Sequence, residues 1–588
     1  MKIIGKKTTI GLMLVFLFII SCSDSFLERN PESNYTGESY YSSDAAILKA
    51  VEPLYNRAWF PFNNRAMLGL GSYRANDAWN PYSFPEFARF QTTALTQILV
   101  DGWGSLFMVV TMSNSILNDV QNHTGPDVTE AAKKQAMGEA YLMRGAAYFY
   151  MLRIWGSTIL FEDNDELIAN PQRPLNPEED VLKFVIRDFR KAAALLPSDL
   201  TTNGRASQWS AKALLAKALL AQSGWNKGTR DQAILDECIS ICEDIIDHSG
   251  AGLIDYEDLF KMQYNNSKES LFAMQWALPP SGGWGSRNSL ISDLSWADVC
   301  DVNCWGESLM ASLDMIEIYN EDPKDTKRLK ANFFYEDAYY DYIKSDEGGY
   351  TYDKKWMHVK KGVVGTKADN GGHLEAQASP LNTYIIRYAD VLLIHAEASL
   401  GNSTELASGR GLESFNLVRN RAGVDPKSKI TFADLIRERR IEFCMEYCTW
   451  FDMVTWYRWQ PEYMLDYFNN KQHRAYEIQA GGIDYDYKED GSGTIDYWLI
   501  NWFDQDNLVQ EKATKYWRYT KRDDENNIIQ TEAQGYVFPG IFEYTNASET
   551  FNRIKITPEN VFLPYPEVDV LQNSLLKGEP QPYNFSEE

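Results

Sequence analysis

One short segment of the chain concentrates aromatic rings and polar side chains. The segment GSYRANDAWNPYSF contains five candidate ligand-binding residues, which are Arg74, Asp77, Trp79, Asn80 and Tyr82. A sugar ring has an apolar C–H face and a rim of hydroxyl groups, so binding it needs flat aromatic faces with polar groups at their edges. This segment therefore predicts a carbohydrate site, although Trp79 could equally anchor the loop in the core.

A second stretch offers further aromatic faces. Trp284 lies in SGGWGSR, Trp296 in LSWAD and Trp305 in NCWGE, and all three are candidate ligand-binding residues. Glycine neighbours at Trp284 and Trp305 would leave those rings free of adjacent side chains. For each of these rings considered alone, packing in the core is slightly favoured over ligand binding. Trp276 ends the segment KESLFAMQW, which reads as a buried strand, so we exclude it from the site.

Common catalytic motifs are missing from the sequence. It contains no HExxH, no GxSxG and no P-loop motif, and its six histidines show no ligand spacing. A surface glycoside hydrolase would need two carboxylates about 5 to 9 Å apart, which this acidic chain could supply. That class stays as an alternative, but we expect a protein that is not an enzyme and needs no cofactor.

The cysteines after Cys22 form three CxxxC pairs, which are Cys238 and Cys242, Cys300 and Cys304, and Cys444 and Cys448. On a helix this spacing puts both thiols on one face. Structural zinc sites usually have tighter pairs, so we expect buried packing and no metal. The acidic loop from Asp484 to Asp490 offers oxygen ligands for calcium, but without the spacing of a known calcium loop.

The N-terminus has the pattern of a secretory signal. Lys2, Lys6 and Lys7 precede an apolar run from Ile10 to Ile20, and that run reaches only about 16 Å, roughly half the thickness a spanning helix must cross. The sequence up to Cys22 resembles a bacterial lipoprotein box. We therefore expect residues 1–21 to be removed and Cys22 to carry a lipid anchor, with a soluble secreted protein as the alternative.

Composition narrows the possible partners. The formal net charge of −25 makes a nucleic-acid partner improbable, because phosphate binding needs a basic surface. Aromatic residues make up 13% of the chain and 17 of them are tryptophan, more than an ordinary core would need. Residues 22–588 are long enough to bury a large core, and we expect them to form a single unit.

Several segments have helical periodicity and clear end signals. Glu139 to Trp155 stops at Gly156, and Tyr388 to Leu400 stops at Gly401. Thr431 with Asp434 would cap a helix that continues through Trp456. Successive helices with short loops suggest a tetratricopeptide-like solenoid, although no clean period near 34 residues is visible. We place this scaffold at about 101–250 and 384–458, with loop-rich ligand-binding regions at about 60–100 and 265–380 and a loop-rich segment at 460–588.

Charged side chains lie on a largely apolar scaffold helix and on the helices that follow it. Asp390 and Glu397 belong to the first, and the following helices carry Arg419, Arg421, Arg437, Glu438, Arg439, Arg440 and Glu442. A half-buried charge needs a partner, because an unpaired one costs several kcal/mol. We therefore interpret this group as a lattice of guanidinium and carboxylate groups that holds helices together, and not as a binding site.

Five segments spread along the chain form a recognisable series. They are SDSFLERNP, GEAYLMRGAAYFYMLRIWGSTILF, GRASQWSAKALLAKALL, the tandem IIRYADVLLIHAEASL, FNLVRNRAG and LIRERRIEFCMEYCTWFDMVTW, and finally KITPENVFLPYPEVDVLQNSLL. Together they resemble the SusD/RagB family of nutrient-binding lipoproteins. These segments frame nearly the whole mature chain. Residues 460–540 make a longer segment than the family pattern has.

The resemblance implies a mostly α protein with a tetratricopeptide-like helical scaffold, long loops and a few short strands. It also implies a lipid-anchored protein on the outer face of the outer membrane, which captures oligosaccharide or polysaccharide for a TonB-dependent SusC-like transporter. Some members bind peptides instead, so peptide capture is the second expectation. Members of the family are not enzymes.

Overall fold

The structure is a computed structural model. It describes residues 41–80, 83–200, 203–278, 286–306, 309–335, 337–353, 357–472 and 555–585, and short strands at 476–478, 484–485, 495–496, 500–501 and 551–552. Cys22 therefore lies outside the described residues. No helix in these ranges is long and apolar enough to cross a membrane.

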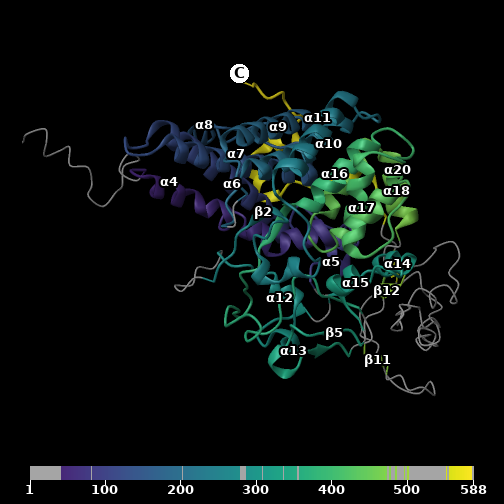
Figure 1. Cartoon of the computed structure of the whole chain (residues 1–588). Coiled ribbons are helices and arrows are strands. Elements are labelled where there is room, and N and C mark those ends of the chain that lie inside the picture. Colours follow the sequence, from purple (N-terminus) through teal and green to yellow (C-terminus); the bar gives the residue numbers. More distant parts are fainter. Residues whose placement is uncertain are drawn as a thin grey trace, which may run out of the picture.

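A succession of packed helices forms the scaffold (Figure 1). Each helix packs against the next in chain order, first within the N-terminal block, then from α11 to α16 and on to α17. The helices in this series are α6 (Gln97–Asn122), α7 (Glu130–Trp155), α9 (Glu178–Leu195), α10 (Gln208–Gly224), α11 (Gln232–His248), α16 (Tyr388–Leu400) and α17 (Arg410–Ala422). This arrangement confirms the mostly α scaffold.

Helix α7 shows how local signals set the ends of the scaffold helices. Thr129 caps its start, because its hydroxyl oxygen accepts a hydrogen bond from the Ala132 N–H at 3.2 Å. Gly156 ends it with a φ of 79°, a conformation that glycine adopts at little cost. The helix begins at Glu130, earlier than expected, and its C-terminal half is buried on all sides instead of along one stripe.

The helix expected from Thr431 to Trp456 is in fact two helices. The capping box of Thr431 and Asp434 is present, but α18 (Phe432–Glu442) ends before α19 (Thr449–Trp459) begins. Between them the chain turns through left-handed residues, including Tyr447 with a φ of 62°. The turn packs on Gly71, where a Cβ would lie 2.0 Å from the Tyr447 carbonyl oxygen. The break is therefore held by a contact far away in the sequence.

Short strands organise the loop-rich regions. Four of them form an antiparallel sheet in the order β1 (Ala78–Trp79), β3 (Met310–Ala311), β7 (His358–Val359) and β4 (Phe333–Phe334). Trp79 lies opposite Met310 in this sheet, so the two loop-rich regions meet there. A separate pair joins β2 (Ser270–Met274) to β8 (Thr383–Arg387) at the start of α16.

The remaining helices and strands are short. The α-helices are α4 (Asp44–Val51), α5 (Pro85–Ala88), α8 (Asn164–Ala169), α12 (Ile291–Leu294), α13 (Ala297–Cys300), α14 (Leu313–Glu321), α15 (Thr326–Asn332), α20 (Pro461–Asp466), α24 (Pro558–Val561) and α25 (Glu567–Gln572). Single turns are η1 (Glu52–Tyr55), η2 (Phe62–Ala66), η3 (Leu68–Tyr73), η4 (Asp258–Phe260), η5 (Met262–Tyr264), η7 (Ser345–Glu347), η8 (Tyr467–Lys471) and η10 (Ser574–Lys577). Strands are β5 (Tyr339–Tyr340), β6 (Tyr350–Thr351), β9 (Tyr476–Ile478), β10 (Asp484–Tyr485), β11 (Ile495–Asp496), β12 (Ile500–Asn501) and β13 (Phe551–Asn552).

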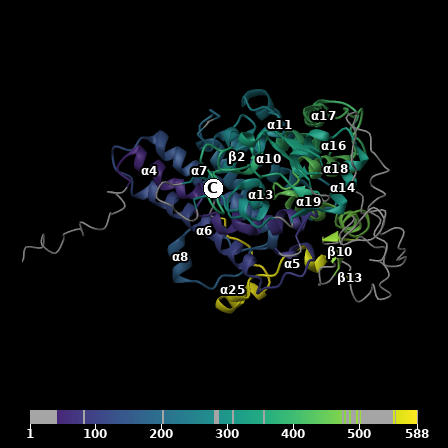
Figure 2. The ribbon, with the colours of Figure 1, turned by 90° about the horizontal axis from the view of Figure 1, so that it is seen from below.

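The C-terminal segment returns to the N-terminal helices, and Figure 2 shows α25 beneath α6 and α8. The Tyr565 hydroxyl donates a hydrogen bond to the Ser157 carbonyl oxygen at 2.8 Å, and the Asn573 amide donates to the Arg173 carbonyl oxygen at 2.8 Å. The main core cluster contains residues from both helical blocks, the loop regions and this segment, from Tyr41 to Leu563.

Candidate functional site

Trp305 presents an aromatic ring at the surface. It is 40% exposed, in contrast to Trp296 at 3%. Its indole N–H donates a hydrogen bond to Asp293 Oδ1 at 3.1 Å, and its main-chain N–H donates to the Ser292 carbonyl oxygen at 2.9 Å. A ring that is both exposed and held at two points is suited to stacking, because part of its conformational freedom is already lost before binding.

Asp293 lies in α12 and connects Trp305 to a basic group. Its Oδ2 lies 3.7 Å from Nε of Arg65, whose side chain is 39% exposed. Burial raises the pKa of the Asp293 carboxyl group, and the Arg65 charge opposes that rise. Arg65 has a φ of 85° inside η2, a costly conformation for a residue with a side chain. The exposed indole and guanidinium groups thus share one buried carboxylate.

Gly306 explains why the segment can lie so close to α12. A Cβ at this position would lie 2.5 Å from the Asp293 carbonyl oxygen, so any larger residue would push the segment away. The Gly306 N–H donates to the Ser295 carbonyl oxygen at 2.7 Å. The glycine after Trp305 therefore allows the close approach that the Trp305–Asp293 hydrogen bond requires.

Trp296 is a core residue, which corrects the expectation that it contacts a ligand. Its ring centroid lies 4.2 Å from that of His358 and 5.5 Å from that of Phe334. A buried ring cannot stack on a sugar. Its main chain nevertheless matters to the site, because Trp296 and Trp305 form an isolated antiparallel β-bridge.

Arg74, Asp77 and Asn80 also lie in the core, and this burial contradicts their assignment as ligand contacts. Arg74 is 1% exposed and donates to the main-chain carbonyl oxygen of Val561 at 2.9 Å, which ties its loop to α24. Asn80 is 2% exposed and its Oδ1 accepts from the Ser83 N–H at 3.1 Å. These side chains hold the loop in place.

Asp77 is fully buried. Burial raises the pKa of its carboxyl group to about 7, although Arg440 and a hydrogen bond from the Met445 N–H act in the opposite direction. Its role is to join η3 and β1 to the turn between α18 and α19, where that Met445 N–H lies 3.3 Å from Asp77 Oδ2.

The other predicted aromatic residues lie beside the same region or outside the described residues. The main chain of Trp79 pairs with Met310, soon after Trp305 in the chain. Tyr82 and Trp284 lie outside the described residues. Just after Trp284, the Ser289 hydroxyl donates to Asn64 Oδ1 at 2.8 Å, beside Arg65. The structure thus brings the segments 60–80 and 286–306 together, as one site would require.

Sequence reasoning missed Arg65 and Asp293. Arg65 follows the aromatic run from Trp59 to Phe62 and Asp293 precedes Trp296 by three residues, but neither has the spacing of a binding motif. Asp293 becomes relevant only because the chain folds back to place Trp305 on α12. The glycine after Trp305, which predicted a free ring, also allows this close approach.

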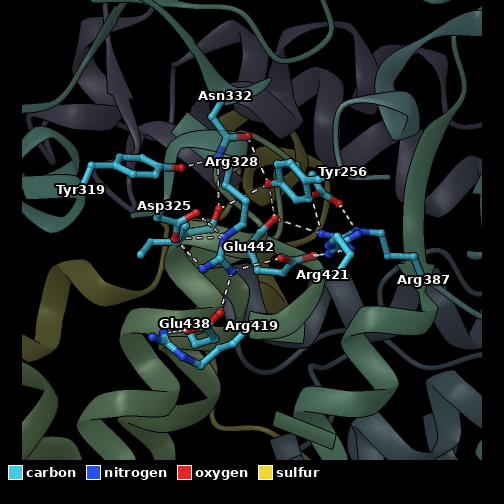
Figure 3. A network of polar contacts seen from close by, with 12 residues as sticks. Tyr256, Tyr319, Asp325, Arg328, Asn332, Arg387, Arg419, Arg421, Glu438 and Glu442 are labelled. Carbon is cyan, nitrogen blue, oxygen red and sulfur yellow. Dashed lines mark hydrogen bonds and ion pairs between the residues drawn. The ribbon is translucent and has the colours of Figure 1, made fainter. Parts of the chain in front are cut away.

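The charged residues of the scaffold form the expected lattice (Figure 3). Glu442 lies at its centre, with Oε1 2.6 Å from Nη1 of Arg387 and Oε2 3.2 Å from Nη1 of Arg328, and it also pairs with Arg421. Burial alone would raise the pKa of the Glu442 carboxyl group, but the three guanidinium groups hold it well below its usual range.

A second cluster pairs the charges of α16. Asp390 Oδ2 lies 2.7 Å from Nζ of Lys217, and its Oδ1 lies 2.6 Å from Nη2 of Arg439. Glu397 pairs with Arg230. All five side chains are buried, so these groups join helices and are not available to a ligand.

The cysteine pairs show no metal centre. Cys238, Cys242, Cys300 and Cys444 are buried, while Cys304 and Cys448 are partly buried. Within the part of the chain that the structure describes, no group of three or more possible ligands is placed to hold a metal ion. Most of the acidic loop 484–490 lies outside that part.

The fold and the site define a class of protein, namely a helical-repeat scaffold whose inserted loops display an exposed tryptophan. Residues 263–581 match the model of the SusD family, and residues 25–220 match a model described as starch-binding associating with outer membrane. A SusD-like protein of Bacteroides ovatus is 45% identical over the full length of both chains. The chain belongs to the SusD family.

Solved structures agree with this assignment. A crystal structure with a xylogluco-oligosaccharide is 44% identical, covers 92% of this chain and 100% of its own, and has a TM-score of 0.76. A SusD-like carbohydrate-binding protein of Bacteroides fragilis is 18% identical, covers 92% of this chain and 100% of its own, and superposes with a TM-score of 0.63, which supports the fold alone.

Proposed function

We propose that this chain is a lipid-anchored protein of the outer cell surface that captures a glycan for a TonB-dependent SusC-like transporter. The observation that carries glycan capture is Trp305, a ring that is 40% exposed and yet fixed by the buried Asp293. Arg65, whose side chain is 39% exposed, faces the other oxygen of that carboxylate, and its guanidinium group can donate hydrogen bonds to sugar hydroxyl groups. The proposed site adds Trp79, Tyr82 and Trp284 from the adjoining segments.

Xylogluco-oligosaccharides are the first ligands to test. They occupy a structural neighbour that is 44% identical to this chain. If one ring covers about 50 Å² of sugar at roughly 25 cal/mol per Å², it contributes about 1.3 kcal/mol. That corresponds to about tenfold in affinity. A few such rings give weak capture of one short chain, which several contacts along a polymer would strengthen.

The test uses the protein without residues 1–22 in calorimetry with xylogluco-oligosaccharides and in affinity gels with a panel of polysaccharides. Trp305→Ala is expected to weaken binding by about tenfold, and Trp305→Phe by less because a flat ring remains. Tyr463→Ala is the matched control, since Tyr463 is 42% exposed but lies on α20, where its ring packs against Phe432 of α18. Equal affinity of Trp305→Ala and the unchanged protein would refute the site.

Two further outcomes decide between classes of function. Binding of peptides without binding of any glycan would change the proposal to peptide import. Release of shorter sugars during incubation would instead show a hydrolase. For delivery, co-purification with the transporter should survive Trp305→Ala, because that change alters the ligand platform and not the scaffold. Loss of transporter association in this variant would contradict the separation of the two surfaces.

A further inference from the structure

The two thiols before Trp305 lie unusually close together. Cys300 Sγ and Cys304 Sγ are 3.0 Å apart, about 1 Å more than a disulfide bond. Cys300 ends α13, and Asp301 follows with a φ of 50°, so the chain leaves the helix and turns back. Within a continuous helix, residues four apart have Cβ atoms about 5 to 6 Å apart, too far for the roughly 3.5 to 4.5 Å of a disulfide. The break at Asp301 therefore permits this approach.

A second CxxxC pair also has hydrogen-bonded thiols, but it differs in its backbone and its burial. Cys238 and Cys242 both lie inside the continuous helix α11, and both are fully buried. Cys304, in contrast, is partly buried and lies in the loop that leads to the exposed Trp305. Figure 1 shows α12 and α13 on the side of the molecule opposite α9 and α11, among the inserted loops.

We propose that Cys300 and Cys304 form a disulfide bond on exposure to a small-molecule disulfide, and that this bond fixes the loop carrying Trp305. The loop is already closed at its base by the β-bridge between Trp296 and Trp305. A bond between the two thiols adds a second closure directly before the ring. The inference rests on the proposed function for the cell-surface location and for the role of Trp305. Formation of the bond is tested separately, by alkylation and peptide masses, whatever the protein binds.

The two thiols have complementary properties for this reaction. The hydrogen bond with Cys304 lowers the pKa of the Cys300 thiol to about 7, and the same bond raises the pKa of Cys304. The pair shares one proton across this hydrogen bond, and when that proton lies on Cys300 the accessible Cys304 sulfur carries the negative charge, attacks the oxidant RSSR, forms a mixed disulfide and releases RS⁻. The Cys300 thiolate then attacks the Cys304 sulfur and releases the second RS⁻. Both leaving groups take up a proton, so two thiols and RSSR give one disulfide and two RSH.

The experiment equilibrates the mature protein with oxidised glutathione, alkylates the remaining thiols under denaturing conditions and measures peptide masses. The peptide containing residues 300–304 is expected to lose two hydrogen atoms and to remain unalkylated. Cys300→Ser should trap a glutathione adduct at Cys304, because the attacking thiolate is gone. Cys304→Ser should leave the buried Cys300 unmodified. Cys238→Ser is the matched control and should leave the 300–304 bond unchanged.

Ligand affinity then tests the consequence for the loop. Reduction of the oxidised protein is expected to weaken binding of a xylogluco-oligosaccharide by about two- to tenfold, the cost of fixing one or more side chains. A fully alkylated 300–304 peptide after oxidation would overturn the bond, whatever the protein binds. Equal affinity of both forms would overturn the role in fixing the loop. A bond that forms in a protein without glycan affinity would refute the proposed function and leave the bond established.

Discussion

The central carboxylate of the buried lattice gives the sharpest stability prediction. Replacing Glu442 with alanine removes the shared partner of three buried guanidinium groups, and breaking a buried ion pair costs about 3 to 5 kcal/mol. Each arginine keeps another carboxylate, since Arg328 retains Glu438 and both Arg387 and Arg421 retain Glu269. We therefore expect the lower end, about 3 kcal/mol, in the free energy of unfolding by urea.

The control and the pH dependence make this prediction refutable. Glu405→Ala removes an exposed pair with Lys429 at 2.7 Å and should leave the free energy of unfolding nearly unchanged, because solvent screens exposed ion pairs. Because the pKa of Glu442 is lowered in the folded protein, its stabilisation is complete above its unfolded pKa of about 4.3 and declines as the pH falls further. The difference between the protein and Glu442→Ala should therefore shrink at pH values below about 4. A cost below 1 kcal/mol at neutral pH would refute the lattice as a source of stability.

Three further changes test the packing around the site. The pKa of Asp77 is raised to about 7, so stability should fall as pH rises from about 4 through 7; thermal melting of Asp77→Asn should lack that fall, and a flat curve for the unchanged protein would contradict it. Gly71→Ala places a Cβ 2.0 Å from a carbonyl oxygen and should cost about 1 to 3 kcal/mol. Gly104→Ala places a Cβ with no atom within 4 Å inside helix α6 and should instead raise stability by about 0.5 to 1 kcal/mol. Trp296→Ala should lower stability by about 3 to 5 kcal/mol, while Trp305→Ala should cost less, about 1 to 3 kcal/mol, because it removes the indole hydrogen bond to the buried Asp293 carboxylate.

Local signals were sufficient for much of the helical scaffold. The helix Tyr388–Leu400 has the predicted bounds, and the chain leaves the helices at Gly156 and Gly401 with positive φ, as a helix stop requires. The prediction was wrong where a distant contact decides the outcome. Nothing between Thr431 and Trp456 reveals that Gly71 will pack against the turn that divides this segment.

The sequence predicted that the buried charges would form ion pairs, but it did not predict which residues would pair. Asp390 and Glu397 lie on an apolar helix, and burial of a charge demands a partner. Their observed partners include Lys217 and Arg230, far away in the sequence. The sequence shows that these buried carboxylates need a basic partner. Which basic residue pairs with each carboxylate depends on how α10 and α11 pack against α16.

Residue type could not separate a binding side chain from a structural one. Arg74, Asp77 and Asn80 have suitable chemistry for a sugar, yet all three are buried. Trp296 and Trp305 lie in similar contexts, and their roles differ because one packs on His358 and the other lies beyond a turn at the surface. The exposure of a side chain depends on the path of the folded chain, and the periodicity of the sequence does not determine that path.

The family resemblance predicts the fold better than the ligand, and the segments that carry the resemblance explain why. The tandem from Ile385 to Trp456 contains the buried ion pairs and the helix ends, and these features hold the scaffold together. Trp305 and Arg65 lie on loops between the resembling segments, where side chains can change without disturbing that lattice. Substitutions at Trp305 and Arg65 should therefore change ligand preference at a smaller cost in stability than substitutions in the lattice, which should alter stability first.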